Sequence, residues 1–177
     1  AVQGDGVALA RRVADALGGA FFPLDAARGT GRALLAQEAM VLDFTALRGP
    51  DLEADLRARD FTINAIALSL HDPNTIIDPL NGQGDLRAGL LRPCSPASFS
   101  DDPLRALRAV RLAMQLNLRL DKAARSLLRA VVPALPTVSP ERVRDEFLRM
   151  LGGPKPAAAV RALDAFGLLA HILPELA

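Results

Sequence analysis

The hydrophobic positions follow a mixed pattern in the first part of the chain. Residues 7–17 place their apolar side chains on one face at helical spacing, and Gly18-Gly19 ends the pattern, so we predict a helix there. Three further segments have the short apolar runs or the alternation that is typical of strands: 20–24, 32–36 and 40–47. The first part is therefore expected to contain both a helix and a small sheet.

The pattern becomes almost wholly helical further along the chain. Residues 60–70 are dense in apolar side chains and predict a buried helix, whereas 76–77 predict a short strand and 78–85 a turn-rich loop. The remaining chain predicts a series of helices: one opening at Ser100, one at 122–132, one from Ser139 to Leu151 and one from Pro156 to Phe166. We predict an α+β fold in two domains, residues 1–95 and the all-helical residues 96–177.

Composition narrows the class of protein. Half of the 177 residues are hydrophobic, which is enough for a folded core. The net charge of +1 hides an uneven distribution, because residues 101–177 carry 12 of the 21 basic side chains and only 8 of the 20 acidic ones. The second part is thus the expected contact for a polyanion.

Cysteine and histidine are too scarce for several kinds of site. A single cysteine, Cys94, excludes an intrachain disulfide and a cysteine-based zinc cluster, and His71 and His171 are too far apart in sequence for a histidine metal motif. No apolar run approaches the roughly 18 residues of a membrane span. We therefore expect a cytoplasmic protein that does not cross a membrane.

The segment from Ser100 to Arg111 has the chemistry of a nucleotide-base reader. Asp101 and Asp102 precede Arg105 by four and three residues, so on a helix either carboxylate can reach its guanidinium. A carboxylate accepts from an exocyclic amino group while a guanidinium donates to a ring nitrogen, and this pair suits adenine and cytosine. Selection of ATP and CTP would then need no template. The alternative is a surface helix capped by Ser100, with ordinary ion pairs.

Two other places carry candidate chemistry. Asp60 and Asn64 lie one helical turn apart, where a carboxylate and an amide could bind ribose hydroxyls, and the adjacent Arg59 could meet a triphosphate. The alternative is a capping Asp60, with Asn64 bonded to the backbone. Asp43 would place a carboxylate on a sheet surface, which is a usual way to hold Mg²⁺, although one carboxylate is a weak metal signal.

Four motifs together resemble one known family. They are Arg59-Asp-Phe-Thr-Ile-Asn-Ala65, Asp78-Pro-Leu-Asn-Gly-Gln-Gly-Asp-Leu86, Asp101-Asp-Pro-Leu-Arg105 and Ser139-Pro-Glu-Arg-Val-Arg-Asp-Glu146. In order and spacing they resemble the class II tRNA nucleotidyltransferase and poly(A) polymerase family. The resemblance implies an incomplete DNA polymerase beta-like head domain with a small mixed β-sheet, followed by a helical neck domain.

The resemblance also implies roles for individual residues. The first motif would recognise ribose and triphosphate, Asp102 and Arg105 would read the base, and the motif around Glu141 and Arg142 would brace the neck helices. Asp43 would be a catalytic carboxylate and a ligand of Mg²⁺. The nucleotide-binding residues that we predict are Arg59, Asp60, Asn64, Asp101, Asp102, Arg105, Arg108 and Arg111.

The family also has motifs that these 177 residues lack. A Gly-Gly-x-x-Arg-Asp segment and the Asp-x-Asp pair that holds two Mg²⁺ ions are missing, and the second would fall just before Ala1. Because Asp43 alone cannot hold both ions, we expect these 177 residues to be an inactive piece of a longer enzyme.

The resemblance implies that the intact enzyme adds C and/or A to the 3′ end of tRNA from CTP and ATP, with release of pyrophosphate. One alternative function is that of a poly(A) polymerase acting on another RNA 3′ end, since such enzymes share all these motifs. Two further alternatives are a degenerate nucleotide- or RNA-binding module without catalysis and a helical scaffold that binds no ligand. The sequence leaves the oligomeric state open.

Overall fold

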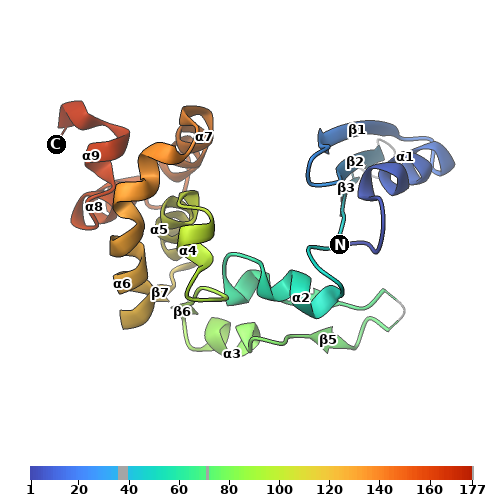
Figure 1. Ribbon diagram of the computed structural model, residues 1–177, viewed down its shortest axis with the longest axis horizontal. Helices are drawn as coiled ribbons and strands as arrows, with labels where there is room; N and C mark the ends of the chain where they lie inside the picture. Colours follow the sequence, from blue (N-terminus) through green and yellow to red (C-terminus); the bar gives the residue numbers. More distant parts are fainter. Residues whose placement is uncertain (36–39, 71, 177) are drawn as a thin grey trace. The chain divides into compact units, whose positions relative to one another are not determined.

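The computed structural model describes residues 1–35, 40–70 and 72–176 (Figure 1). Its contacts divide the chain into two compact units, Ala1–Asp55 and Leu56–Ala177, and each is described by itself. The first unit combines a sheet with a helix and the second is mainly helical, so the predicted α+β class is confirmed. The predicted strand end at Ala36, and His71, lie outside the described residues.

The first unit is a three-stranded antiparallel sheet with a helix packed against it. Its elements are α1 (Gly6–Ala16), β1 (Ala20–Asp25), β2 (Thr30–Leu35) and β3 (Met40–Thr45). Asp5 fixes the start of α1, because its carboxylate accepts hydrogen bonds from the N–H groups of Val7 and Ala8. All four elements predicted here are confirmed, with ends that differ by one or two residues.

A close approach between α1 and β2 depends on a glycine. A Cβ added at Gly31 would lie only 2.7 Å from the Cβ of Ala10, so only glycine leaves room for the helix. Ala10 and Ala33 are fully buried in this contact region. The helix therefore covers one face of the sheet, and the other face carries the cross-strand neighbours Arg32 and Asp43.

A parallel bridge makes the sheet mixed. Val2 pairs with Ala46 just beyond the end of β3, where the N–H of Val2 donates to the carbonyl of Thr45 at 2.8 Å and the N–H of Leu47 donates to the carbonyl of Val2 at 3.0 Å. The first residues of the chain therefore lie along the edge of β3 that β2 does not occupy.

The second unit begins with short elements. They are the end of α2 (Leu52–Arg57), which crosses the division, the 3₁₀ turn η2 (Thr62–Asn64), β4 (Ala67–Leu68), β5 (Ile76–Ile77), α3 (Gly82–Arg87) and β6 (Leu90–Leu91). β4 pairs with β5 in antiparallel fashion, and β6 pairs in parallel with β7 (Arg119–Leu120). The predicted strand at 76–77 is confirmed, whereas the loop predicted at 78–85 contains the start of α3.

The predicted helix over residues 60–70 is wrong. The N–H of Thr62 donates to the carbonyl of Arg92 at 2.9 Å, and the N–H of Cys94 donates to the carbonyl of Asp60 at 3.1 Å. These long-range bonds hold the backbone around Phe61 extended, which leaves only one 3₁₀ turn before β4. The apolar density reflects burial of Phe61 and Ala65 and not a helical period.

The helices predicted at 122–132, from Ser139 to Leu151 and from Pro156 to Phe166 are present as α6 (Lys122–Val131), α7 (Pro140–Leu151) and α8 (Pro156–Ala165). The segment predicted to open a helix at Ser100 contains α4 (Ser98–Asp101) and α5 (Leu104–Leu116). Three further elements were not predicted: η3 (Val132–Thr137), α9 (Leu169–Ile172) and η4 (Pro174–Leu176). Phe61 and Leu91 belong to the same buried cluster as Leu107, Leu128 and Leu163 of these helices. The domain boundary predicted near residue 95 thus falls inside one compact unit, and as a division between head and neck it stays a prediction. No helix in the described part of the chain is long and apolar enough to cross a membrane.

The helix predicted to open at Ser100 is two helices. Asp102 separates α4 from α5 with an extended backbone (φ −152°, ψ 100°). The cause is Pro103, since a residue that precedes proline is disfavoured in the helical region. Ser100 lies inside α4 and is not the cap of α5. The side-chain carboxylate of Asp102 accepts instead from the N–H of Leu104 at 3.3 Å.

Candidate functional site

Asp60 and Asn64 are brought together as predicted, and a third residue joins them. The Asp60 carboxylate accepts from Asn64 Nδ2 at 3.0 Å and from the N–H of Phe61 at 2.8 Å through Oδ1. Its Oδ2 accepts from Arg108 Nε at 3.0 Å and Nη2 at 2.6 Å. Burial alone would raise the pKa of Asp60, but the bonds from Asn64 and the charge of Arg108 outweigh burial and lower it. Asp60 is thus an ionised, buried anchor that fixes Asn64.

Arg108 and Arg111 on α5 face a buried carboxylate of α7. Glu146 is 1% exposed, and its Oε1 accepts from Arg108 Nη1 at 3.3 Å and Arg149 Nη1 at 3.1 Å. Its Oε2 accepts from Arg111 Nε at 2.6 Å. Burial would lower the pKa of Arg108, but Asp60 and Glu146 raise it above its usual value. Both guanidiniums therefore belong to an internal ion network, and their contact with a nucleotide stays a prediction.

Arg105 is held by main-chain oxygens. Its Nη1 donates to Ser98 Oγ at 2.9 Å, to the carbonyl of Ser98 at 3.1 Å and to the carbonyl of Arg59 at 3.4 Å. Its Nη2 donates to the carbonyl of Ala58 at 3.2 Å. The buried hydroxyl of Ser98 donates in turn to the carbonyl of Asp60 at 2.9 Å. Arg105 therefore joins α5 to the segment that contains Asp60.

Asp102 pairs with a residue outside its own motif. Its Oδ2 accepts from Arg142 Nη2 of α7 at 2.7 Å. The helical Asp–Arg pair expected between Asp101 or Asp102 and Arg105 is not recorded among the described residues, because the break at Pro103 takes both aspartates off the α5 helix. Asp101 ends α4 and is exposed. Asp102 and Arg105 are thus each fixed separately.

The Asp78 to Asp85 segment makes hydrogen bonds that fix the turn containing Asn64. Asp78 accepts from the N–H groups of Gly82 at 2.7 Å and Gln83 at 2.9 Å, as predicted for a structured turn. Asp85 does not bond to loop amides but accepts from Thr62 Oγ1 at 2.7 Å and from Arg92. Arg59 reaches the carbonyl of Asn64 at 3.2 Å. The segment therefore holds the turn on which Asn64 sits.

Asp43 lies in the first unit, paired with its cross-strand neighbour. Arg32 Nε donates to Asp43 Oδ1 at 2.7 Å and Nη2 donates to Oδ2 at 2.8 Å. The hydrogen bonds from Arg32 lower the pKa of this carboxyl, which is therefore ionised at neutral pH. Both of its oxygens face a guanidinium, and within the described ranges no three acidic, histidine or cysteine side chains gather as metal ligands. The residues described here do not by themselves fit a two-Mg²⁺ site.

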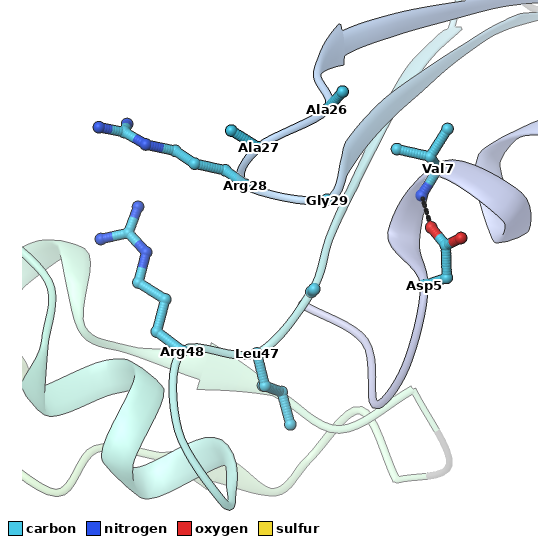
Figure 2. Close-up of a pocket in the computed structure, with 9 residues that line it drawn as sticks. Asp5, Val7, Ala26, Ala27, Arg28, Gly29, Leu47 and Arg48 are labelled. Carbon is cyan, nitrogen blue, oxygen red and sulfur yellow. Dashed lines mark hydrogen bonds between the residues drawn. The ribbon is translucent and has the colours of Figure 1, made fainter.

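A hollow in the first unit opens between the start of α1, the β1–β2 turn and the residues that follow β3. Asp5, Val7, Gly29 and Leu47 contribute to its lining, and Figure 2 shows the side chains of Arg28 and Arg48 extending to the same side of it. Asp5 is already bonded to the N–H of Val7. None of the residues predicted for the site lines this hollow.

Some contributors to the site were not predicted. Ser98, Glu146 and Arg149 carry much of the hydrogen bonding around Arg105, Arg108 and Arg111. Glu146 had a sequence signal, because it follows Arg142 by four residues and shares its face of α7. Ser98 had none, since its contacts with Arg105 and with Asp60, 7 and 38 residues away, depend on the fold around the break between α4 and α5.

Two family models match the chain. Residues 27–92 match the family described as "Poly A polymerase head domain", and residues 117–177 match "Probable RNA and SrmB-binding site of polymerase A". The chain is 42% identical over 164 residues to the CC-adding tRNA nucleotidyltransferase of Geobacter sulfurreducens, covering 93% of this chain and 38% of that protein. It is 42% identical over 177 residues to the A-adding tRNA nucleotidyltransferase of Deinococcus radiodurans, covering 97% and 40%. The chain thus spans about two fifths of these relatives.

Solved structures agree with the sequence comparison. A CCA-adding enzyme in complex with CTP superposes with a TM-score of 0.86 at 29% identity, over 98% of this chain and 43% of that one. The Thermotoga maritima CCA-adding enzyme in complex with tRNA gives 0.85 at 29% identity, over 98% and 42%. With the four motifs in order and the head and RNA-binding models matched, the chain belongs to the class II tRNA nucleotidyltransferase and poly(A) polymerase family.

Proposed function

We propose that the complete encoded protein transfers a nucleoside monophosphate from CTP and/or ATP to the 3′ hydroxyl of tRNA and releases pyrophosphate. The observation that carries this proposal is that Asp102 and Arg105, three residues apart, are each held in a fixed orientation. Each is held by its own partners, Arg142 for the first and the carbonyls of Ala58 and Ser98 for the second. Relatives named for CC, A and CCA addition match the same stretch of chain.

The free hydrogen-bonding capacity of this pair suits cytosine and adenine. The Nε–H of Arg105 and one Nη2–H have no recorded acceptor among the described residues, so they are available to donate to a ring nitrogen. The Asp102 carboxylate keeps lone pairs beyond the two bonds that it accepts. It can therefore accept from an exocyclic amino group, whereas uracil and guanine present a carbonyl there and would face a like acceptor.

Asn64 and Arg59 are the proposed contacts for the sugar and the triphosphate. The side-chain amide of Asn64 donates one hydrogen to Asp60. Its second amide hydrogen and its side-chain carbonyl are the groups proposed to bind ribose hydroxyls. Asp60, whose oxygens already accept four bonds, positions Asn64 and does not itself bind the ribose. Arg108 supports the same contact by holding Asp60.

For Mg²⁺, the proposal relies on the strand register at Val2. Since Val2 lies opposite Ala46 in a parallel pair, the second residue upstream of Ala1 in a longer chain would lie opposite Asp43, with its side chain on the same face. The fourth residue upstream would share that face. We propose that acidic residues at these two positions complete the Mg²⁺ site with Asp43, after Arg32 is displaced.

The basic face of α6 supports RNA as the acceptor. Lys122, Arg125 and Arg129 recur at spacings of three and four residues on its exposed side, and Arg119 precedes them on β7. Asp121 is the only acidic residue between 118 and 140, and its carboxylate accepts from the N–H of Ala124. This surface is therefore positively charged and suited to phosphates. A cytoplasmic location remains part of the proposal.

A transfer assay tests this function. The complete protein is incubated with Mg²⁺, each of the four labelled nucleoside triphosphates and a tRNA that lacks its 3′ CCA. We expect incorporation from CTP, ATP or both, and little from UTP and GTP. A protein that binds the tRNA and CTP but incorporates neither nucleotide would instead be a binding module without transferase activity.

A further inference from the structure

The carboxylate of Asp102 is held from a different helix. Its Oδ2 accepts from Arg142 Nη2 at 2.7 Å, and Arg142 lies in the first turn of α7, directly after the helix start at Ser139-Pro140. The pair is open to solvent, since the side chains of Arg142 and Asp102 are 43% and 22% exposed. A nucleotide base can therefore reach the carboxylate while the bond to Arg142 persists.

Asp102 has few other means of keeping its orientation. It lies in the extended link between α4 and α5, outside the regular turns of both helices. The bond from the N–H of Leu104 to Oδ1 is long, at 3.3 Å. Arg105 is the next cation along the chain, and its guanidinium is turned to the carbonyls of Ala58, Arg59 and Ser98. Arg142 is thus the charged group that sets the direction of this carboxylate.

The ionic contact of α7 with α5 and its contact with the link that precedes α5 differ in burial. Glu146, one turn after Arg142, is buried and binds Arg108 and Arg111 within the core. The Arg142–Asp102 pair lies at the surface, where an ion pair contributes little to folding. A contribution to folding stability therefore explains the buried contact of Glu146, but it does not explain the exposed contact of Arg142 with Asp102.

We propose that Arg142 is a positioning residue for base selection. By holding Oδ2 of Asp102, it keeps the carboxylate facing the exocyclic amino group of cytosine or adenine and away from the guanidinium of Arg105. Without it, the carboxylate is free to rotate toward Arg105, and the acceptor and the donor would neutralise each other. This inference rests on the proposed function, because it assigns a residue to the base reader of that same site.

The test compares Arg142→Ala with Arg144→Ala in the complete protein. Arg144 lies two residues further on α7, is exposed, and its recorded ion pair within the described residues is with its neighbour Asp145, so its replacement matches the chemical change on the same helix. The measured quantity is the ratio of kcat/KM for CTP to that for UTP on tRNA without its CCA end. We expect Arg142→Ala to lower this ratio about tenfold, the order of effect of loosening one base contact. Arg144→Ala should leave it unchanged.

Further variants separate positioning from other roles. Arg142→Lys keeps the charge but loses the planar fork, so its ratio should lie between those of the parent protein and Arg142→Ala. Melting temperatures of all variants are compared, and if Arg142→Ala does not fold, Arg142→Gln is judged by the same criterion. An equal rise in KM for CTP and UTP with an unchanged ratio would show that Arg142 binds the triphosphate, and it would overturn the inference. If the parent protein transfers no nucleotide, the proposed function fails first and this inference fails with it.

Discussion

At the scale of single residues, the site is organised by an ion network in which one carboxylate, Glu146, binds three guanidiniums and one guanidinium, Arg108, binds two carboxylates. Glu146 accepts from Arg108, Arg111 and Arg149, and Arg108 also binds Asp60. A buried charge is tolerated only when such partners compensate for its lost hydration. Removal of any one of these charged side chains is therefore expected to leave its partner without full compensation.

Neutralising Glu146 should destabilise the fold. Glu146→Gln keeps the size of the side chain but removes the buried charge that pairs with Arg111, and it leaves Arg108 with Asp60 as its counter-charge. We expect the free energy of unfolding to fall by roughly 3 kcal/mol. Urea denaturation measures the change, and Asp145→Asn, an exposed neighbour on the same helix, is the control with a shift near zero. Equal stability of the two variants would contradict this account of the network.

Closeness in sequence was only a partial guide at the residue level, because it predicted that Asp60 and Asn64 lie together but also predicted a pair of Asp102 with Arg105 that is not recorded among the described residues. The contact of Asp60 with Asn64 follows from a separation of four residues, even though the backbone there is a single 3₁₀ turn and not the predicted helix. The partner of Asp102 could not be predicted, because Arg142 is 40 residues away and several other arginines have similar spacing. The hydrophobic periodicity of a helix does not indicate which arginine of the folded chain lies beside Asp102.

At the scale of elements, Pro103 is the residue that makes the observed helices differ from the predicted one. Proline is tolerated in a first helical turn, which favoured one helix from Ser100, but its constraint on the preceding residue ends α4 at Asp101. The long helices were predictable because their apolar faces repeat over three or more turns. Apart from the strand at 76–77, the short elements between residues 60 and 91 were not, since contacts distant in sequence fix them.

The junction of α3 with η2 should be sensitive to one added carbon. A Cβ at Gly82 would lie 2.1 Å from the carbonyl oxygen of Thr62, so Gly82→Ala must push these two elements apart. We expect a loss of about 2 kcal/mol in unfolding free energy. Gly152→Ala is the matched control, because its nearest neighbour is 3.5 Å away and its φ of −78° suits alanine. A Gly82→Ala protein as stable as this control would refute the close contact.

The basic face of α6 should contribute electrostatically to tRNA binding. Replacing Lys122, Arg125 and Arg129 with alanine removes three charges from one helix face. If they contact phosphates, the slope of log K against log salt concentration becomes shallower by roughly 2. The control replaces the exposed Arg12, Arg144 and Arg161 with alanine, which changes the net charge equally. Identical slopes for the two triple variants would exclude α6 as an RNA contact.

At the scale of the whole molecule, the chain holds two parts of a nucleotidyltransferase in separate compact units. The first unit carries Asp43 on its sheet, and the second carries the proposed base reader, Asp102 and Arg105, with its ionic contacts. The order of four motifs was enough to predict the family, because each motif is local in sequence. The pairing of Asp43 with Arg32 was not predicted, since it depends on the strand register.

The central claim is that Asp102, with Arg105, selects the base of the incoming nucleotide. Asp102→Asn in the complete protein tests it most directly, because the change keeps the shape of the side chain and replaces a carboxylate oxygen by an amide that donates. The measurement is incorporation from each of the four nucleoside triphosphates into tRNA without its CCA end. We predict that incorporation from CTP and ATP falls relative to UTP and GTP, while the melting temperature stays close to that of the parent protein. An unchanged order of preference among the four nucleotides would contradict the claim.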